Sequence, residues 1–249
     1  MHAISIHNVT KQYRLGRMRN GKPVHVLDSV SLNVQKGEFV GIIGPNGCGK
    51  STLFKMILGL EKPGSGEVTV LGKKPEDIQM GYVPQHSSGA LYPWFTSKEN
   101  LDFAVKENNA GTAQLISNKI QEFGVSMYTN AYPYQLSGGL KQLLSIARAT
   151  LYSNILLLDE PLTGLDYQNR MAVEKKLLDM RNGQNTAVMI SHDIESAILL
   201  CDRIIILTPK PARIKAVLAI PLPKNRTHET RFLPEYQHAL SNVYAALLE

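Results

Sequence analysis

The stretch Gly44-Pro45-Asn46-Gly47-Cys48-Gly49-Lys50-Ser51-Thr52 decides the fold of this chain. It matches the phosphate-loop pattern, in which glycines let backbone N–H groups approach phosphates, the lysine reaches the β- and γ-phosphates and the serine hydroxyl meets Mg²⁺. The short apolar run 38–43 before it predicts a strand, and residues 53–58 after it favour a helix. This setting favours an anion site over an ordinary Gly-rich turn, because the helix dipole and the unpaired N–H groups attract negative charge.

A second informative segment is the run Ile155-Leu156-Leu157-Leu158-Asp159-Glu160. Continuous aliphatic residues are typical of a buried parallel strand, and the two acids follow where such a strand leaves the core. In this Walker B pattern Asp159 is expected to hold the Mg²⁺ shell. Glu160 is expected on the other side of the strand end, where it could polarise an attacking water as general base. The alternative is a pair of solvated acids at the start of a loop.

The third segment, Leu136-Ser137-Gly138-Gly139, precedes a predicted helix. A glycine pair there would let the backbone approach a γ-phosphate closely, as a second phosphate clamp. Lys141 and Gln142 are expected at a polar edge of this helix. Its predicted apolar face consists of Leu140, Leu143, Leu144, Ala147 and Leu151.

With these three segments, the chain resembles the ATP-binding cassette superfamily over nearly its whole length, and residues 136–139 match the signature motif of that family. The resemblance implies that this clamp completes the ATP site of a partner subunit, so that two cassettes sandwich two nucleotides. The cofactors that it implies are ATP and Mg²⁺. One cassette per chain therefore predicts a dimer, with a second copy or with a homologue.

The resemblance implies roles for four further side chains. Gln85 matches the glutamine loop that senses Mg²⁺ and the γ-phosphate, and His192 matches the switch histidine that contacts the γ-phosphate. Asp166 resembles the loop aspartate that links the two sites across the dimer, and Tyr13 resembles the aromatic residue that stacks on adenine. The alternatives are a solvated glutamine, a structural histidine and a core tyrosine. The expected catalytic residues are Glu160 and His192; the expected metal ligands are Ser51, Gln85 and Asp159; the expected nucleotide ligands are Tyr13, Gly44, Pro45, Asn46, Gly47, Cys48, Gly49, Lys50, Ser51, Thr52, Gln85, Ser137, Gly138, Gly139, Asp159 and Asp166.

Composition and charge narrow the class of protein. The 249 residues are 43% hydrophobic, which is enough for a core, and no stretch reaches the eighteen apolar residues or so of a membrane span. The start lacks the apolar core of a signal peptide, so we expect a peripheral protein at the cytoplasmic face of the cell membrane. Cys48 and Cys201 form no disulfide framework.

The net charge of +6 raises the question of nucleic-acid binding. The positive charge is concentrated in residues 11–22 and 210–231, while the rest of the chain is net acidic. The first segment fits a loop that leans toward the nucleotide or toward an acidic partner, and the second fits a tail. Solvated surface is the alternative for both. Because no recognition-helix, zinc-ligand or RNA-binding motif accompanies them, we predict no nucleic-acid partner.

The order of the patterns predicts the organisation. Alternating stretches at 4–7, 26–32 and 66–70 indicate an antiparallel sheet. Residues 40–85 and 150–208 alternate strand and helix. The predicted fold class is α/β, with a phosphate-loop (RecA-like) ATPase core, an antiparallel β subdomain and an inserted helical subdomain. The predicted boundaries are a single ATPase domain over 1–249, with the core and antiparallel sheet in 1–87 and 150–210, the helical subdomain in 88–149 and a C-terminal tail in 211–249.

Residues 90–96, Ala-Leu-Tyr-Pro-Trp-Phe-Thr, resemble a stretch of the nitrate, sulfonate and taurine importer ATPases, and residues 210–224 are also similar to that group. Trp94 fits a groove that receives a short coupling helix, with core packing as the alternative. The resemblance implies an ATP-hydrolysing subunit that energises solute import. The implied partners are integral membrane permease subunits, a second cassette and, indirectly, a solute-binding protein.

Three other functions are open to the same motifs. An exporter cassette is the nearest. A cassette ATPase of ribosomes or chromosomes would need a second cassette or a long coiled-coil insertion, for which residues 86–135 leave no room. A regulatory protein that holds ATP without turnover is disfavoured by the presence of Glu160 and His192.

Overall fold

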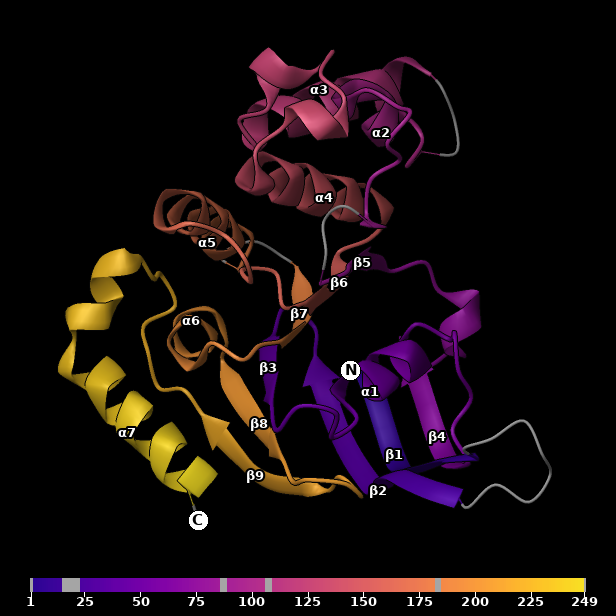
Figure 1. Cartoon of the computed structure of the whole chain (residues 1–249), viewed down its shortest axis with the longest axis vertical. Coiled ribbons are helices and arrows are strands. Elements are labelled where there is room, and N and C mark those ends of the chain that lie inside the picture. Colours follow the sequence, from indigo (N-terminus) through magenta and orange to yellow (C-terminus); the bar gives the residue numbers. More distant parts are fainter. Residues whose placement is uncertain (1, 15–22, 86–88, 106–108, 182–184, 249) are drawn as a thin grey trace. The chain divides into compact units, whose positions relative to one another are not determined.

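The computed structural model describes residues 2–14, 23–85, 89–105, 109–181 and 185–248. The chain divides into two compact units, which are drawn together in Figure 1: unit 1 comprises Met1–Ile78 and Val188–Glu249, and unit 2 comprises Gln79–Ala187. Arg17, Arg19 and Lys22, which belong to the first basic segment of the sequence, lie outside the described residues.

Unit 1 contains an antiparallel sheet with the strand order β2-β1-β4 (Figure 1). Its strands are β1 (His2–Arg14), β2 (Pro23–Gln35) and β4 (Ser65–Val70). The central Ile6 pairs with Leu32 on one side and with Val68 on the other. All three side chains are buried, as expected of cross-strand neighbours on the covered face of a sheet. The antiparallel sheet predicted from the sequence is confirmed.

A second group of strands in unit 1 leads into the phosphate loop, which follows β3 (Phe39–Ile43). Strand β3 pairs in parallel with β8 (Arg203–Leu207), and β9 (Ile214–Ala219) pairs antiparallel with β8. Every residue of β3 is buried, as its aliphatic run predicts. Helix α1 (Lys50–Ile57) packs near β4, α6 (Ile194–Leu200) packs on β3 and β8, and α7 (Pro234–Leu248) packs on α6. Short 3-10 turns occupy Pro75–Asp77 and His228–Phe232.

Unit 2 contains a short parallel strand pair and most of the helices. Strand β5 (Gly81–Val83) pairs with β6 (Ile155–Asp159), which is buried over its whole length. The helices are α2 (Ser97–Asp102), α3 (Ala110–Glu122), α4 (Gly138–Tyr152) and α5 (Tyr167–Arg181), with 3-10 turns at Ser126–Tyr128 and Pro133–Gln135. Strand β7 (Thr186–Ile190) carries the chain from unit 2 into unit 1.

The buried face of α4 differs in part from the predicted one. Leu144 and Ala147 are buried as expected, but Leu140, Leu143 and Leu151 are only half-buried. Gln142, expected at a polar edge, is buried together with Ser145 and Ile146. The physical reason is that α4 packs against α2, α3, α5 and β5, so its covered surface is wider than a single stripe.

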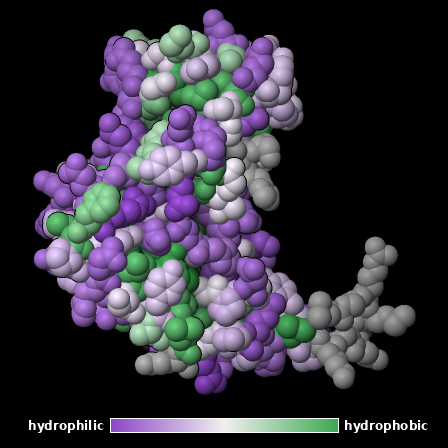
Figure 2. Space-filling model, turned by 60° about the vertical axis from the view of Figure 1, so that its left-hand side comes forward, coloured by the Kyte–Doolittle hydropathy of each residue, from purple (hydrophilic) through white to green (hydrophobic). Residues whose placement is uncertain are grey.

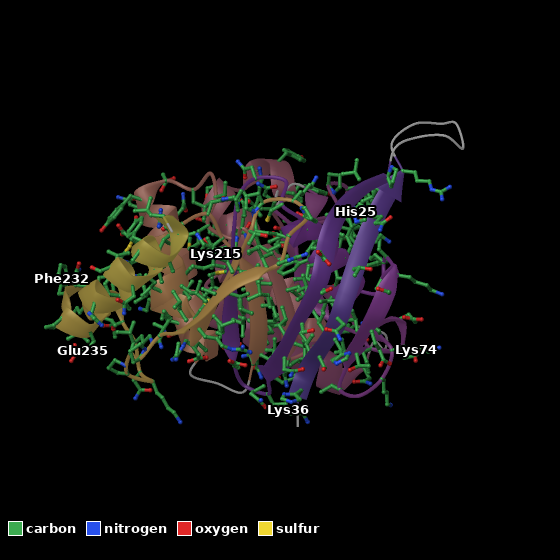
Figure 3. The ribbon with its side chains drawn as sticks, turned by 90° about the horizontal axis from the view of Figure 1, so that it is seen from below. His25, Lys36, Lys74, Lys215, Phe232 and Glu235 are labelled. Atoms are coloured by element: carbon green, nitrogen blue, oxygen red, sulfur yellow. The ribbon has the colours of Figure 1, made fainter. Side chains whose placement is uncertain are left out.

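The second basic segment is only partly solvated. Arg213 is exposed and pairs with Asp28, and Lys215 projects from β9 (Figure 3). Arg226, in contrast, is 3% exposed, and its guanidinium donates to backbone carbonyls at the C-terminal end of α6, among them Cys201 O at 2.7 Å. A basic residue that the composition assigns to the surface is therefore part of the core of unit 1.

None of the helices in the described ranges is long and apolar enough to cross a membrane. On the face drawn in Figure 2, hydrophilic residues predominate and hydrophobic ones form small separate areas.

Candidate functional site

The phosphate loop joins β3 to α1 in unit 1. Gly47 and Gly49 have φ angles of 71° and 130°, which side chains disfavour, and a Cβ on Gly49 would lie 2.8 Å from Leu27 Cδ2. Gly49 is the N-cap of α1, and among the described residues no side chain caps this helix end. Its first N–H groups are therefore available to an anion.

Lys50 is held close to the loop that precedes it. Its side chain is 6% exposed, and Nζ donates to Gly44 O at 2.8 Å and to Pro45 O at 3.0 Å. Two carbonyls thus fix a buried ammonium beside the glycine turn, so that the charge is in place for a phosphate without a search among rotamers. The next residue, Ser51, is exposed and leaves its hydroxyl accessible.

Tyr13, at the end of β1, lies beside α1. Its hydroxyl donates to Glu61 and lies 3.5 Å from Thr52 Oγ1. Lys11 Nζ lies 5.3 Å from the ring centroid and 3.4 Å from Glu61 Oε2. Burial and the hydrogen bond to Glu61 raise the pKa of Tyr13, so the phenol stays neutral. Tyr13 is thus half-buried and anchored by its hydroxyl, with a ring that borders the helix of the phosphate loop.

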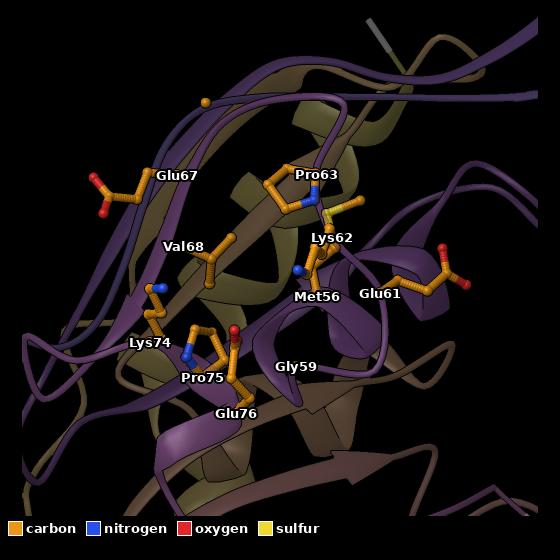
Figure 4. Close-up of a pocket in the computed structure, with 11 residues that line it drawn as sticks. Met56, Gly59, Glu61, Lys62, Pro63, Glu67, Val68, Lys74, Pro75 and Glu76 are labelled. Atoms are coloured by element: carbon orange, nitrogen blue, oxygen red, sulfur yellow. The ribbon is translucent and has the colours of Figure 1, made fainter.

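Glu61 also lines a hollow of about 320 Å³ in unit 1 (Figure 4). Its floor is apolar, with Met56 and Val68, and its rim carries acids and lysines in alternation. None of residues 44–52 lines it, so the hollow is separate from the phosphate loop. Its lining residues are Met56, Gly59, Glu61, Lys62, Pro63, Gly66, Glu67, Val68, Lys74, Pro75 and Glu76.

Asp159 and Glu160 follow the buried aliphatic run of β6 in unit 2, as the sequence predicts. Asp159 is 8% exposed, and its Oδ2 lies 3.5 Å from the hydroxyl of Tyr82. Burial, followed by the charge of Asp159, raises the pKa of Tyr82. A carboxylate in this position, at the end of a buried strand, is a suitable ligand for a hard cation such as Mg²⁺, which binds through oxygen atoms.

Glu160 lies next to Gln85. The Nε2 group of Gln85 donates to Glu160 Oε2 at 3.0 Å, and the hydroxyl of Thr163 donates to the same oxygen at 3.0 Å. Glu160 has a φ angle of 49°, an uncommon conformation for a residue with a side chain, and such strain clusters at functional sites. The structure brings these two predicted site residues together and adds Thr163, which no sequence motif marks as a site residue.

The signature segment begins α4. The hydroxyl of Ser137 accepts a hydrogen bond from Leu140 N at 3.3 Å, so it is the N-cap of the helix, as its residue type predicts. Asp166 precedes α5 and accepts from the backbone N–H and the side-chain amide of Asn169 at 2.9 and 2.6 Å. No motif in the sequence marks Asn169 as a functional residue.

His192 lies between β7 and α6 in unit 1 and is exposed. The residues on either side of it are bonded to each other, because Ser191 Oγ donates to Asp193 O and Asp193 N donates to Ser191 Oγ, both at 3.0 Å. Asp193 also caps α6 through Ser196 N at 3.3 Å. His192 therefore lies on a short turn that is stabilised by hydrogen bonds on both sides of it.

The expected oxygen ligands fit a magnesium ion chemically. Asp159 supplies a carboxylate, Ser51 an accessible hydroxyl and Gln85 a carboxamide, all of them hard donors. Ser51 belongs to unit 1, and Asp159 and Gln85 belong to unit 2. A phosphate loop with a preset lysine, and a buried strand that ends in two acids, define a phosphate-loop nucleotide hydrolase.

Comparisons with known proteins identify the family. The family model described as "ABC transporter" matches residues 27–163. The chain is 35% identical over 240 residues to the aliphatic sulfonates import ATP-binding protein SsuB of Bacillus cereus, covering 91% of this chain and 90% of that one. It is 35% identical over 237 residues to the nitrate import ATP-binding protein NrtD of Synechocystis, covering 89% and 88%.

A solved structure of a dimeric ATP-binding cassette, in a post-hydrolysis state bound to ADP and Pi, matches with a TM-score of 0.73 and 30% identity over 87% of this chain and 98% of that one. The chain therefore belongs to the ABC transporter family. It binds ATP and is the ATPase subunit of an ABC transporter, and the predicted α/β cassette fold is confirmed.

Proposed function

We propose that this chain energises solute import, with Glu160 as the general base of ATP hydrolysis. The observation that carries the proposal is the hydrogen bond between Gln85 Nε2 and Glu160 Oε2. It joins the predicted base to the residue that resembles the family's glutamine loop, so a change at the nucleotide can act on Gln85 as well as on Glu160. Import is supported by relatives that are named import ATP-binding proteins, for sulfonates and for nitrate.

The chain's own groups divide the chemistry. Lys50 and the N–H groups at the start of α1 bind the β- and γ-phosphates, and Tyr13 stacks on adenine. Ser51, Asp159 and Gln85 hold Mg²⁺, which when bound neutralises phosphate charge. Glu160 accepts a proton from the attacking water, and His192 contacts the γ-phosphate. The remaining ligands are those of the phosphate loop, residues 44–52.

The proposed function also implies partners for this chain. Ser137, Gly138, Gly139 and Asp166 act on the nucleotide of a second cassette, in support of which the similar cassette of known structure is dimeric. Trp94 is 66% exposed, and its ring lies 5.6 Å from the ring of Tyr92 at an interplanar angle of 42°, so it is not a core residue and is available to an integral membrane permease subunit. We place the chain at the cytoplasmic face of the membrane, with a solute-binding protein as an indirect partner and no nucleic acid.

We also propose the domain limits inferred from the pattern of the sequence. One ATPase domain covers residues 1–249. Its core and antiparallel sheet occupy 1–87 and 150–210, its helical subdomain 88–149 and its C-terminal tail 211–249.

Glu160→Gln tests the chemistry. We expect ATP turnover, measured as phosphate release, to fall by ~10²–10⁴, because the amide cannot accept the proton. ATP binding should persist and the paired state should accumulate. Glu235→Gln, an exposed acid in the first turn of α7, is the matched control and should keep wild-type turnover. Normal turnover in Glu160→Gln would show that another group is the base.

Purification from gently solubilised native membranes tests the transport role. A polytopic partner together with a solute-binding protein is the expected result. A polytopic partner that exports the solute in vesicles would favour an exporter. Recovery of ribosomes or DNA alone with the chain would refute a role in transport.

A further inference from the structure

Asn169 holds both carboxylate oxygens of Asp166. Its backbone N–H donates to Oδ1 at 2.9 Å, and its side-chain Nδ2 donates to Oδ2 at 2.6 Å. The first of these bonds is the main reason that the pKa of Asp166 lies below its usual range. An ordinary helix cap uses only a backbone N–H. Here the side chain three residues along adds a second bond, so the carboxylate is fixed in orientation as well as in place.

The same amide packs on the signature glycine. A Cβ built on Gly139 would lie 2.1 Å from Asn169 Oδ1 and 2.4 Å from Asn169 Cγ. The Cα of Gly139 is therefore in direct contact with the amide group. One residue earlier, a Cβ on Gly138 would lie 3.6 Å from Leu165 Cδ2, which is ordinary van der Waals contact. Residues 138–139 and 165–169 thus form a packed pair of segments within unit 2.

We propose that Asn169 is a positioning residue that fixes Asp166 and the signature glycines as one rigid group. The inference rests on the proposed pairing of two cassettes, in which both segments meet the partner's nucleotide. Two independently mobile segments would each lose freedom when the cassettes close, and a preassembled group avoids that loss. Asn169 reaches both segments, since its Nδ2 bonds to Asp166 and its Oδ1 lies against Gly139.

The test compares ATP-driven pairing with ATP binding to the single cassette. In a Glu160→Gln background, sedimentation velocity gives the ATP concentration at half pairing. Asn169→Ala should raise that concentration about tenfold. Binding of a fluorescent ATP analogue, at protein concentrations too low for pairing, should change less than twofold, because Asn169 is not part of the phosphate loop. Gln168→Ala, the loss of an exposed neighbouring amide, is the control and should pair as the parent does.

A second variant separates shape from hydrogen bonding. Asn169→Asp keeps the volume against Gly139 but sets a carboxylate against Asp166, so it should pair at least as poorly as Asn169→Ala. Pairing of both variants at the parent's ATP concentration would overturn the proposal. So would an equal loss of analogue binding and pairing, since that result marks a residue needed only for folding. If the Glu160→Gln parent itself fails to pair, the proposed function is what fails.

Discussion

The buried guanidinium of Arg226 gives the sharpest test of how unit 1 is held together. Nη1 donates to Ile198 O, Leu199 O and Cys201 O at 3.1, 3.1 and 2.7 Å, and Nη2 donates to Ile220 O at 3.4 Å. The first three carbonyls belong to the C-terminal end of α6, which a helix leaves without partners of its own. Arg226→Met keeps a side chain of moderate volume and removes every one of these donors.

The expected loss follows from these contacts. A buried acceptor without a donor costs about 1–3 kcal/mol, and truncating one side of a buried charged arrangement costs about 3–5 kcal/mol. Some carbonyls will find water after the substitution, so we expect the free energy of unfolding to fall by about 3 kcal/mol. At roughly 2–4 °C per kcal/mol for a chain of this size, the melting temperature should drop by about 6–12 °C.

Thermal melts followed by circular dichroism at 222 nm measure this loss. The matched control is Arg213→Met, which removes a second arginine of the same segment whose side chain is 68% exposed and pairs with Asp28 at 2.5 Å. An exposed pair contributes about 0–1 kcal/mol, so this variant should melt within about 4 °C of the parent. Equal losses in the two variants would refute the assignment of Arg226 to the core.

Two further predictions concern other parts of the chain. Burial raises the pKa of Glu61, but hydrogen bonds from Tyr13 and Lys11 outweigh it and hold that pKa below 4.5; the ionised carboxylate therefore stabilises the fold above about pH 4.5, and this stability is lost as the pH falls through the lower folded value. The difference in melting temperature between wild type and Glu61→Gln should accordingly be full at pH 7 and shrink steadily as the pH falls below 4.5, and a difference that stays constant across this range would contradict the argument. Gly81→Ala should lower the free energy of unfolding in urea by about 1–3 kcal/mol, because the new Cβ would lie 2.4 Å from Ala149 O; wild-type stability would show that β5 and α4 are not packed this tightly.

Local sequence patterns predicted the elements that carry the phosphate loop and the paired acids. The aliphatic runs of β3 and β6 are fully buried strands, as continuous apolar residues require. The pattern was less informative for α4, since periodicity finds one apolar stripe and this helix is covered on several sides. It gave no sign of Arg226, whose acceptors lie up to 28 positions away. A long basic side chain in a Pro-rich segment resembles a solvated tail until its carbonyl partners are known.

In the candidate site, too, the sequence predicts the residues that are neighbours in the chain but not the contacts between distant ones. The ligands in residues 44–52 are adjacent in sequence, so a local pattern can identify them. Gln85 and Glu160 are 75 positions apart, and their contact depends on how β5 and β6 pair. Gly139 illustrates the difference most clearly: the sequence explains this glycine by close approach to a phosphate, whereas the fold adds a second reason, because Asn169 occupies the space of a Cβ. Either reason alone requires glycine at position 139, so a substitution there cannot tell the two apart. The function of the contact between Gly139 and Asn169 has to be tested by substituting Asn169.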